Sequence, residues 1–292
     1  MKPNPLRWRK MMPICAYVEM ADGLQPLGPA WEQFSKAVAR CRPDILVMNE
    51  MPFGPWLARK HDFANEDARH SVEIHEAGIT GLAALNLRAI ITSRPILLAG
   101  RLANEAIVIE DGQVRPLHTK TYLPQEPGWS EVSWFNRGDG RFNIQNICGL
   151  GVGVLLCTEL MFNEHARHYG RCGADLIAVP RATGSAHDSW ITAGKMASLV
   201  SGSYVVSSNR VGHSADGPRF GGGGFAITPG GDLAGRTGTG SAIMQVHIDP
   251  QVSARQRRSI PVTSTNCVTL SATRPLTRVF SFQKLSRHSS RR

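Results

Sequence analysis

The chain has 292 residues, 42% of them hydrophobic and 19% charged, and a formal net charge of +10. This composition is that of a folded globular protein and excludes an intrinsically disordered chain, and the length allows one large α/β unit or two domains. No run of 18 apolar residues occurs, so we expect neither a transmembrane helix nor a membrane partner.

Strands and helices alternate in the first half of the chain. Residues 1–12 are basic and lack an apolar run, so we interpret them as a short flexible leader and not as a secretory signal. The spacing of Trp31, Phe34 and Val38 predicts a helix, and the apolar residues on both sides of Asp111-Gly112 predict a β-hairpin. In order, we expect strand 13–18, helix 30–40, strand 45–48, helix 72–87, strand 96–99, and a hairpin of 106–110 with 113–116.

The second half continues the alternation and ends in a basic segment. We expect strand 149–156, helix 160–170, strand 176–179, helix 191–202, strand 204–207, and a hairpin that pairs 224–228 with 242–248. Alternating elements with interspersed hairpins favour a layered α/β fold with mixed sheets. Residues 255–292 hold eight Arg and one Lys but no acidic residue. We interpret 251–292 as an irregular, solvated basic tail. We do not expect nucleic acid as a partner, because no helix-turn-helix, zinc-finger or aromatic RNA-binding pattern accompanies the charge.

The cysteines and histidines do not form a recognisable metal or disulfide pattern. Six cysteines occur at irregular spacing and without a C-x-x-C motif, so we expect free thiols and a cytoplasmic location. His165 and His168 lie on a predicted helix, with His187 further along the chain. Because no third ligand follows at metal-site spacing, the pair favours a surface helix over a metal site.

Three reactive side chains follow predicted strands. Cys157 precedes a predicted helix whose N-terminal N–H groups would favour a thiolate, but a buried cysteine can equally pack as a small hydrophobic residue. Glu50 ends the strand 45–48 and is either a base or an exposed acid at the rim. Lys120 follows the predicted hairpin, where a solvated surface lysine is the more common outcome. No single residue decides between these alternatives.

The order glutamate, lysine, cysteine, each at a strand end, resembles the nitrilase superfamily of carbon–nitrogen hydrolases. Three segments carry the resemblance: an apolar strand that ends in a glutamate (44–50, DILVMNE), a lysine loop (120–139), and a cysteine elbow (151–164, GVGVLLCTELMFNE). With weaker similarities further on, the resemblance covers about residues 12–250. We predict that these residues form one carbon–nitrogen hydrolase domain.

The resemblance implies a fold and a set of roles. The fold would be an α/β four-layer α-β-β-α sandwich of the nitrilase type with two mixed β-sheets. Glu50 would be the general base, Lys120 the oxyanion stabiliser and Cys157 the nucleophile, while Glu131 would support this triad or position the substrate. No metal or organic cofactor is needed for such a reaction. Members of this superfamily commonly assemble, so we expect a homo-oligomer.

The implied activity is hydrolysis of non-peptide carbon–nitrogen bonds in a small amide or N-carbamoyl substrate, through a thioester acyl-enzyme. Three alternatives stay open: a nitrilase that acts on a nitrile, an acyltransferase, and a silent binding protein on the same fold. Thr158 and Asn163 depart from the residues usual in the elbow, so the substrate class is not fixed by the resemblance.

Five residues near the predicted strand ends are candidates for substrate binding. Arg181 could pair with a substrate carboxylate, although a surface arginine is an equal alternative. The others could form the walls of a pocket; they are Thr158, Trp56, Trp129 and Trp134.

Overall fold

The computed structural model describes residues 12–213 and 217–260. Most of the predicted leader and residues 261–292 of the predicted tail therefore lie outside the described residues. The beginning of the tail is a helix, α6 (Pro250–Ser259), in which the side chain of Asp249 accepts a hydrogen bond from the backbone N–H of Gln251 at 2.9 Å. The expectation of an irregular segment from residue 250 is therefore wrong for these ten residues, because an Asp N-cap followed by Pro is a helix start.

The first sheet contains six strands in the order β15-β1-β2-β3-β4-β5. β1, β2 and β3 run parallel, while β15, β4 and β5 pair antiparallel to their neighbours, so the sheet is mixed. The turn between β4 and β5 is the predicted one, with positive φ at Asp111 (51°) and Gly112 (73°), as a tight hairpin of this twist requires. The strands are β1 (Ile14–Ala21), β2 (Ile45–Val47), β3 (Ala89–Leu98), β4 (Arg101–Glu110), β5 (Gln113–Thr119) and β15 (Ile243–His247).

The second sheet is also mixed, with the order β8-β9-β10-β11-β13-β14. β12 (Arg219–Gly221) pairs with the far end of β11, where β11 also pairs in parallel with the end of β1. This last pairing joins the two sheets into one hydrogen-bonded network. The other strands are β8 (Gln145–Ile147), β9 (Leu150–Val154), β10 (Leu176–Pro180), β11 (Tyr204–His213), β13 (Phe225–Ile227) and β14 (Leu233–Arg236).

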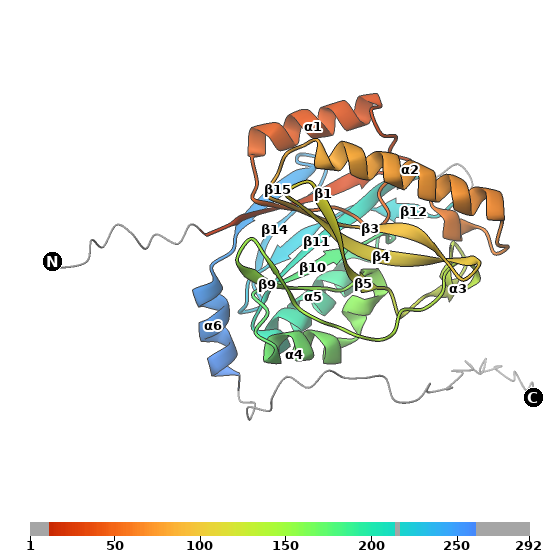
Figure 1. The fold of residues 1–292 in the computed structure, drawn as a ribbon. Coiled ribbons are helices and arrows are strands. Elements are labelled where there is room, and N and C mark those ends of the chain that lie inside the picture. Colours follow the sequence, from red (N-terminus) through yellow and green to blue (C-terminus); the bar gives the residue numbers. More distant parts are fainter. Residues whose placement is uncertain (1–11, 214–216, 261–292) are drawn as a thin grey trace, which may run out of the picture.

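Helices cover the outer face of each sheet, which gives four layers and confirms the predicted sandwich (Figure 1). α1 (Pro29–Cys41) and α2 (Asn65–Ala83) pack on the first sheet, and α4 (Asn163–Arg171) and α5 (His187–Ser201) pack on the second. The alternation of side chains along β2 shows how the sequence specifies the layers. Ile45 and Val47 belong to the apolar cluster between the sheets, whereas Leu46 and Met48 face the helices.

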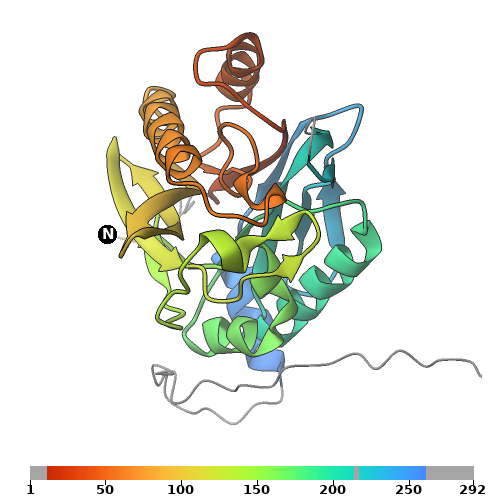
Figure 2. The ribbon, with the colours of Figure 1, turned by 90° about the vertical axis from the view of Figure 1, so that its right-hand side faces the viewer.

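Five short elements lie at the ends of these strands and form the edge that Figure 2 faces, with residues 120–135 in yellow-green at the front. A fourth apolar cluster, which includes Met51, Trp56 and Trp134, supports this edge. The elements are η2 (Leu57–Arg59), β6 (Gln125–Glu126), β7 (Trp129–Ser130), α3 (Glu131–Trp134) and η3 (Cys157–Met161).

Two sequence-based predictions of pairing and boundaries are wrong. The predicted hairpin of 224–228 with 242–248 does not form, because β13 pairs with β14 and β15 crosses to the first sheet beside β1. The helix predicted at 72–87 begins at Asn65 and ends at Ala83, and the following strand begins at Ala89 instead of residue 96. Residues 89–91 are fully apolar and buried on both faces, so they show no alternation that would mark a strand.

The expectations of a surface histidine pair and of free cysteines throughout are both corrected by the structure. His165 and His168 are buried on α4 and not on its surface, and no group of His, Cys, Asp or Glu within the described residues could hold a metal ion. Cys15, Cys41, Cys148 and Cys157 carry free thiols, but Cys172 is disulfide-bonded, so free thiols are the wrong expectation there. None of the helices in the described ranges is long and apolar enough to cross a membrane.

Candidate active site

Lys120 lies between two glutamates in the interior of the protein. Its Nζ is 2.8 Å from Oε1 of Glu50, and 2.8 Å and 2.7 Å from the two carboxylate oxygens of Glu131. All three side chains are fully buried, and they come from the loop after β2, the end of β5 and the start of α3. Burial alone would lower the pKa of Lys120, but the carboxylates of Glu131 and Glu50 raise it above its ordinary value. The lysine is therefore a buried ammonium.

Glu131 differs from an ordinary glutamate in its affinity for a proton. Burial raises its pKa to about 8, against the opposing effect of the Lys120 ammonium, and the nearby carboxylate of Glu50 adds to the rise. The cluster of two carboxylates and one ammonium therefore holds an extra proton more readily than a glutamate in water does.

Asn104, on β4, is a second donor to Glu50. Its Nδ2 is 2.8 Å from Oε1 of Glu50, and the same oxygen also accepts a hydrogen bond from Nζ of Lys120. Oε2 of Glu50 is buried and has no hydrogen-bond partner among the described residues. The sequence analysis did not single out Asn104, although an asparagine inside the apolar run of β4 is the kind of buried polar residue that marks a site.

Cys157 forms the turn between β9 and η3. It is 2% exposed, and its φ of 51° lies in the left-handed region that a non-glycine residue rarely adopts. Burial and the Glu50 carboxylate raise the pKa of the thiol, and the opposing effect of Lys120 is smaller. The expectation that a helix N-terminus favours a thiolate is therefore wrong, because Cys157 opens a 3-10 turn and α4 begins only at Asn163. The thiol needs a base to ionise.

The segment that follows β10 contacts both Glu50 and Cys157. The backbone N–H of Glu50 donates to the carbonyl of Arg181 at 3.2 Å, and Sγ of Cys157 lies 4.0 Å from the carbonyl oxygen of the next residue, Ala182. Thr183 continues the segment and is fixed by Asn209, whose Oδ1 accepts its backbone N–H at 2.9 Å. The segment after β10 thus links residue 50, after β2 of the first sheet, to residue 157, after β9 of the second sheet.

Glu159 joins the lysine loop to the cysteine elbow, a role that the sequence analysis missed. Its carboxylate accepts the backbone N–H groups of Thr121 (2.7 Å) and Leu156 (2.8 Å), the neighbours of Lys120 and Cys157. The imidazole Nε2 of His118 lies 2.9 Å from the same carboxylate. Burial alone would raise the pKa of Glu159 and lower that of His118, but their mutual attraction reverses both shifts. The two therefore form a buried ion pair.

A cavity of about 340 Å³ opens beside the thiol. Two of the predicted substrate-binding residues, Thr158 and Trp129, line it. The indole N–H of Trp129 donates to the carbonyl of Ala182 at 3.1 Å, which fixes this wall against the segment after β10. The remaining lining residues are Pro124, Glu126, Cys157, Ala182, Thr183, Gly184, Ser185, Ala186 and Trp190.

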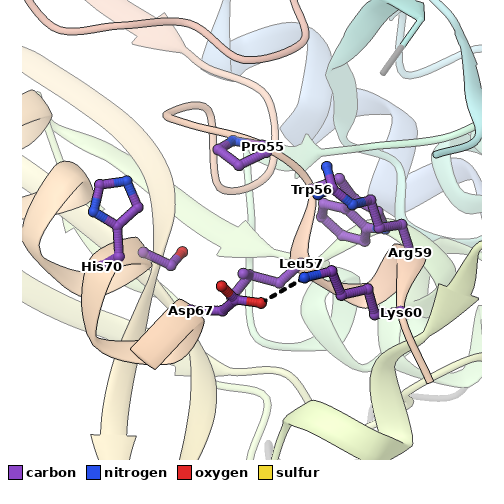
Figure 3. Close-up of a pocket in the computed structure, with 8 residues that line it drawn as sticks. Pro55, Trp56, Leu57, Arg59, Lys60, Asp67 and His70 are labelled. Carbon is purple, nitrogen blue, oxygen red and sulfur yellow. Dashed lines mark hydrogen bonds and ion pairs between the residues drawn. The ribbon is translucent and has the colours of Figure 1, made fainter. Parts of the chain in front are cut away.

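The other two tryptophans lie outside this lining. Trp56 borders a separate small pocket at the start of α2, which Figure 3 shows with the ion pair of Lys60 and Asp67. Trp134 is fully buried, and its indole N–H donates to the carbonyl of Lys60 at 2.8 Å. The structure therefore places both side chains in the apolar support of the site and not beside the thiol.

Arg181 is buried, so the surface alternative is wrong, while its pairing with a substrate carboxylate stays a prediction. Its guanidinium donates to Oγ of Ser207 (2.6 Å), Oγ1 of Thr183 (3.1 Å) and the carbonyl of Gly223 (2.9 Å), and it is 1% exposed. It also lies 5.1 Å from the ring centre of Trp190. This arginine is therefore not on the surface, and it is not among the residues that line the cavity.

A family model described as carbon-nitrogen hydrolase matches residues 21–258. The chain belongs to the carbon-nitrogen hydrolase family. The matched residues include the whole buried cluster, the elbow and the residues that line the cavity.

Comparison with curated relatives and solved structures agrees with this assignment. An N-carbamoylputrescine amidase of Solanum tuberosum is 35% identical over 80 residues, 27% of this chain and 27% of the relative. An (R)-stereoselective amidase of a Pseudomonas species is 29% identical over 164 residues, 54% and 57% of the two chains. The chain thus spans about a quarter to just over half the length of these relatives. The fold matches a carbon-nitrogen hydrolase of Helicobacter pylori with a TM-score of 0.77 and 21% identity, over 85% of this chain and 93% of that one.

Proposed function

We propose that this carbon-nitrogen hydrolase family member cleaves the carbon–nitrogen bond of a small amide or N-carbamoyl compound through a thioester on Cys157. One observation carries the proposal: the buried Lys120 ammonium, held by two carboxylates, accompanies a neutral thiol that lines a cavity. This arrangement supplies a base, a nucleophile and a cation for the oxyanion. The amidase names of the relatives support the same reaction class.

The first half-reaction forms the thioester. Oε2 of Glu50, which has no partner among the described residues, takes the proton of the Cys157 thiol. The thiolate attacks the carbonyl carbon, and the Lys120 ammonium with the backbone N–H of Thr158 stabilises the oxyanion. When the tetrahedral intermediate collapses, the carbon–nitrogen bond breaks and Glu50 returns its proton to the departing amine or ammonia.

The second half-reaction consumes one water. Glu50 takes a proton from the water, the hydroxide oxygen attacks the thioester, and the carbon–sulfur bond breaks to regenerate the Cys157 thiol with the proton from Glu50. Glu131 keeps Lys120 in place through both of its carboxylate oxygens. We include in the proposal a catalytic domain over residues 12–250, a cytoplasmic location and a homo-oligomeric state.

Intact-protein mass spectrometry tests this proposal. Wild type and Cys157→Ala are incubated with a panel of amides, N-carbamoyl amines and nitriles, and ammonia release is measured in parallel. We expect an acyl adduct and ammonia release with the wild type alone, and the mass of the adduct separates amide from carbamoyl substrates. Full turnover by Cys157→Ala would overturn the proposal. A panel in which only nitriles react would replace the amidase proposal by a nitrilase.

A further inference from the structure

The cavity beside Cys157 has an acidic residue in its lining and no basic one among the described residues. Among the eleven described residues that line it, Glu126 is the only acidic one, and these eleven include no lysine, arginine or histidine. Glu126 is exposed, and its carboxylate forms no hydrogen bond or ion pair within the described residues. An unpaired carboxylate at a cavity wall is free to interact with a ligand.

The backbone that carries Glu126 is fixed on both sides. Residue 126 pairs with Trp129 in the two-stranded β6–β7 hairpin. The carbonyl of Gly128 in the turn accepts the indole N–H of Trp56 at 3.2 Å, and the indole of Trp129 is bonded to Ala182. The hairpin is therefore anchored to the segments that follow β2 and β10, and it holds the carboxylate at a defined edge of the cavity.

Neither of the two buried cations near the thiol is among the residues that line the cavity, so neither contacts a ligand there directly. Lys120 is enclosed by the carboxylates of Glu50 and Glu131, so the three groups carry no free positive charge. Arg181 uses its guanidinium donors on Ser207, Thr183 and Gly223. A carboxylate on the substrate would therefore enter an apolar space without a cation to pair with, at a cost that favours its exclusion.

The apolar walls suit the opposite ligand charge. Trp129 and Trp190 line the cavity, and the Trp190 ring already lies 5.1 Å from the guanidinium of Arg181. Because aromatic rings attract alkylammonium groups through their electron-rich faces, Trp129 is the ring that suits such a ligand. An alkyl chain would pack on these rings while its ammonium group reaches Glu126 at the edge.

We propose that Glu126 selects substrates by charge, so that the enzyme accepts amides and N-carbamoyl amines whose remote end is an ammonium or a neutral alkyl group and rejects those that end in a carboxylate. This inference rests on the proposed function, which supplies the reaction at Cys157. It makes Glu126 a specificity residue that is separate from the buried cluster.

Alkylation of Cys157 tests the charge selection without requiring turnover. The full chain is treated with iodoacetamide (neutral), iodoacetate (anionic) and bromoethylammonium (cationic), and the rate at each cysteine is read by peptide mass mapping. Cys41, which is partly exposed on α1, is the internal reference. We expect the ratio of iodoacetamide to iodoacetate rates to be about tenfold higher at Cys157 than at Cys41. We also expect Glu126→Gln to raise the iodoacetate rate at Cys157 about three- to tenfold while the iodoacetamide rate stays the same.

The matched control is Glu76→Gln, which removes an exposed carboxylate of α2 outside the cavity lining. It should leave all three rates at Cys157 unchanged. Equal rate ratios in the wild type and Glu126→Gln would overturn the inference, whether or not the wild type turns over any amide. Glu126→Lys should reverse the preference and make iodoacetate the faster of the two charged reagents.

A turnover assay then separates the two proposals. Hexanamide, its ω-amino analogue and its ω-carboxy analogue are compared by kcat/KM in the wild type and Glu126→Gln. We expect the ω-amino compound to lose about three- to tenfold in the variant, mainly through KM, and hexanamide to be unaffected. If Cys157-dependent turnover of the ω-carboxy compound were as fast as that of the ω-amino compound, the charge selection would be disproved and the hydrolase proposal would be unaffected.

Discussion

Asn104 donates to Oε1 of Glu50 at 2.8 Å, and Lys120 donates to the same oxygen at the same distance. Two donors therefore fix the rotation of the carboxylate and leave Oε2 without a partner in the described part of the chain. This geometry presents one specific oxygen of the proposed base, so Asn104 acts on the reaction by positioning Glu50.

Replacing Asn104 by Asp tests this positioning. The variant has the same shape but sets a second buried carboxylate against Glu50 in place of an N–H donor. We expect kcat to fall by about 100-fold, on the scale of a misplaced catalytic group, with little change in KM because Asn104 does not line the cavity. Steady-state kinetics on the substrate found by the adduct screen measures both. Asn146→Asp, at an exposed position of β8, is the control. A rise in KM at constant kcat would contradict the assigned role.

Removing the charge of Lys120 should destabilise the fold as well as stop the reaction. Lys120→Met leaves two fully buried carboxylates without their cation, which costs about 3–5 kcal/mol of the free energy of unfolding. Adding Glu131→Gln to this variant should recover part of the loss, because only one buried charge remains. Urea unfolding measures all three proteins. Lys60→Met breaks an exposed pair and should change stability by less than about 1 kcal/mol. Equal stability of Lys120→Met and wild type would be incompatible with a buried ammonium.

The alternation of strands and helices could be predicted because its signals are local, whereas the set of Glu50, Lys120 and Cys157 rests on the family resemblance, because no single one of these residues decides between a catalytic and a structural role. Each residue follows a strand, but β2 and β5 belong to the first sheet and β9 to the second, so the packing of the two sheets also decides where these residues lie. The partners Asn104 and Glu159 could not be predicted in this way. Asn104 meets Glu50 across 54 residues and Glu159 meets Thr121 across 38, so only the folded chain shows that they touch.

The pairing of strands that are far apart in the sequence could not be predicted either. The sequence of β15 is compatible with a hairpin to the preceding strand. In the structure, β15 instead pairs antiparallel with β1 in the first sheet. The four predicted wall residues divide in a related way, because a tryptophan's position in the sequence does not say which side of a loop it faces. Trp129 lines the cavity, while Trp134, five residues later, packs inside the support of the site.

The ion pair of His118 and Glu159 should make the free energy of unfolding depend on pH on both the alkaline and the acidic side. The pKa of His118 is raised, so its contribution is complete below the ordinary histidine pKa and is lost as pH rises through the raised value. The pKa of Glu159 is lowered, so its contribution is present above the ordinary glutamate pKa and is lost as pH falls through the lowered value. The free energy of unfolding should therefore decline on the alkaline side in the wild type and decline less in His118→Gln. An identical alkaline slope in both proteins would show that the imidazole is not charged. His247→Gln, at an exposed position of β15, is the control.

His75 should weaken the protein in mild acid. It is 2% exposed on α2; its Nδ1 lies 2.7 Å from the carbonyl of Ser71, and its Nε2 accepts the backbone N–H of Phe53 at 3.3 Å, so the neutral ring is fully bonded. Burial lowers its pKa from 6.5 to about 4.

Between these two values the unfolded chain binds a proton at His75 that the folded chain excludes, so stability falls as pH drops through 6.5 towards 4. The linkage amounts to about 2 kcal/mol at about pH 5 and about 3 kcal/mol at about pH 4. Urea unfolding of wild type and His75→Gln at about pH 7.5 and about pH 5 measures it. The variant removes the titrating ring, so its loss between the two pH values should be about 2 kcal/mol smaller than that of the wild type. His70→Gln, an exposed histidine of the same helix, should keep the wild-type loss, and a loss that is as large in His75→Gln would assign the acid sensitivity to other groups.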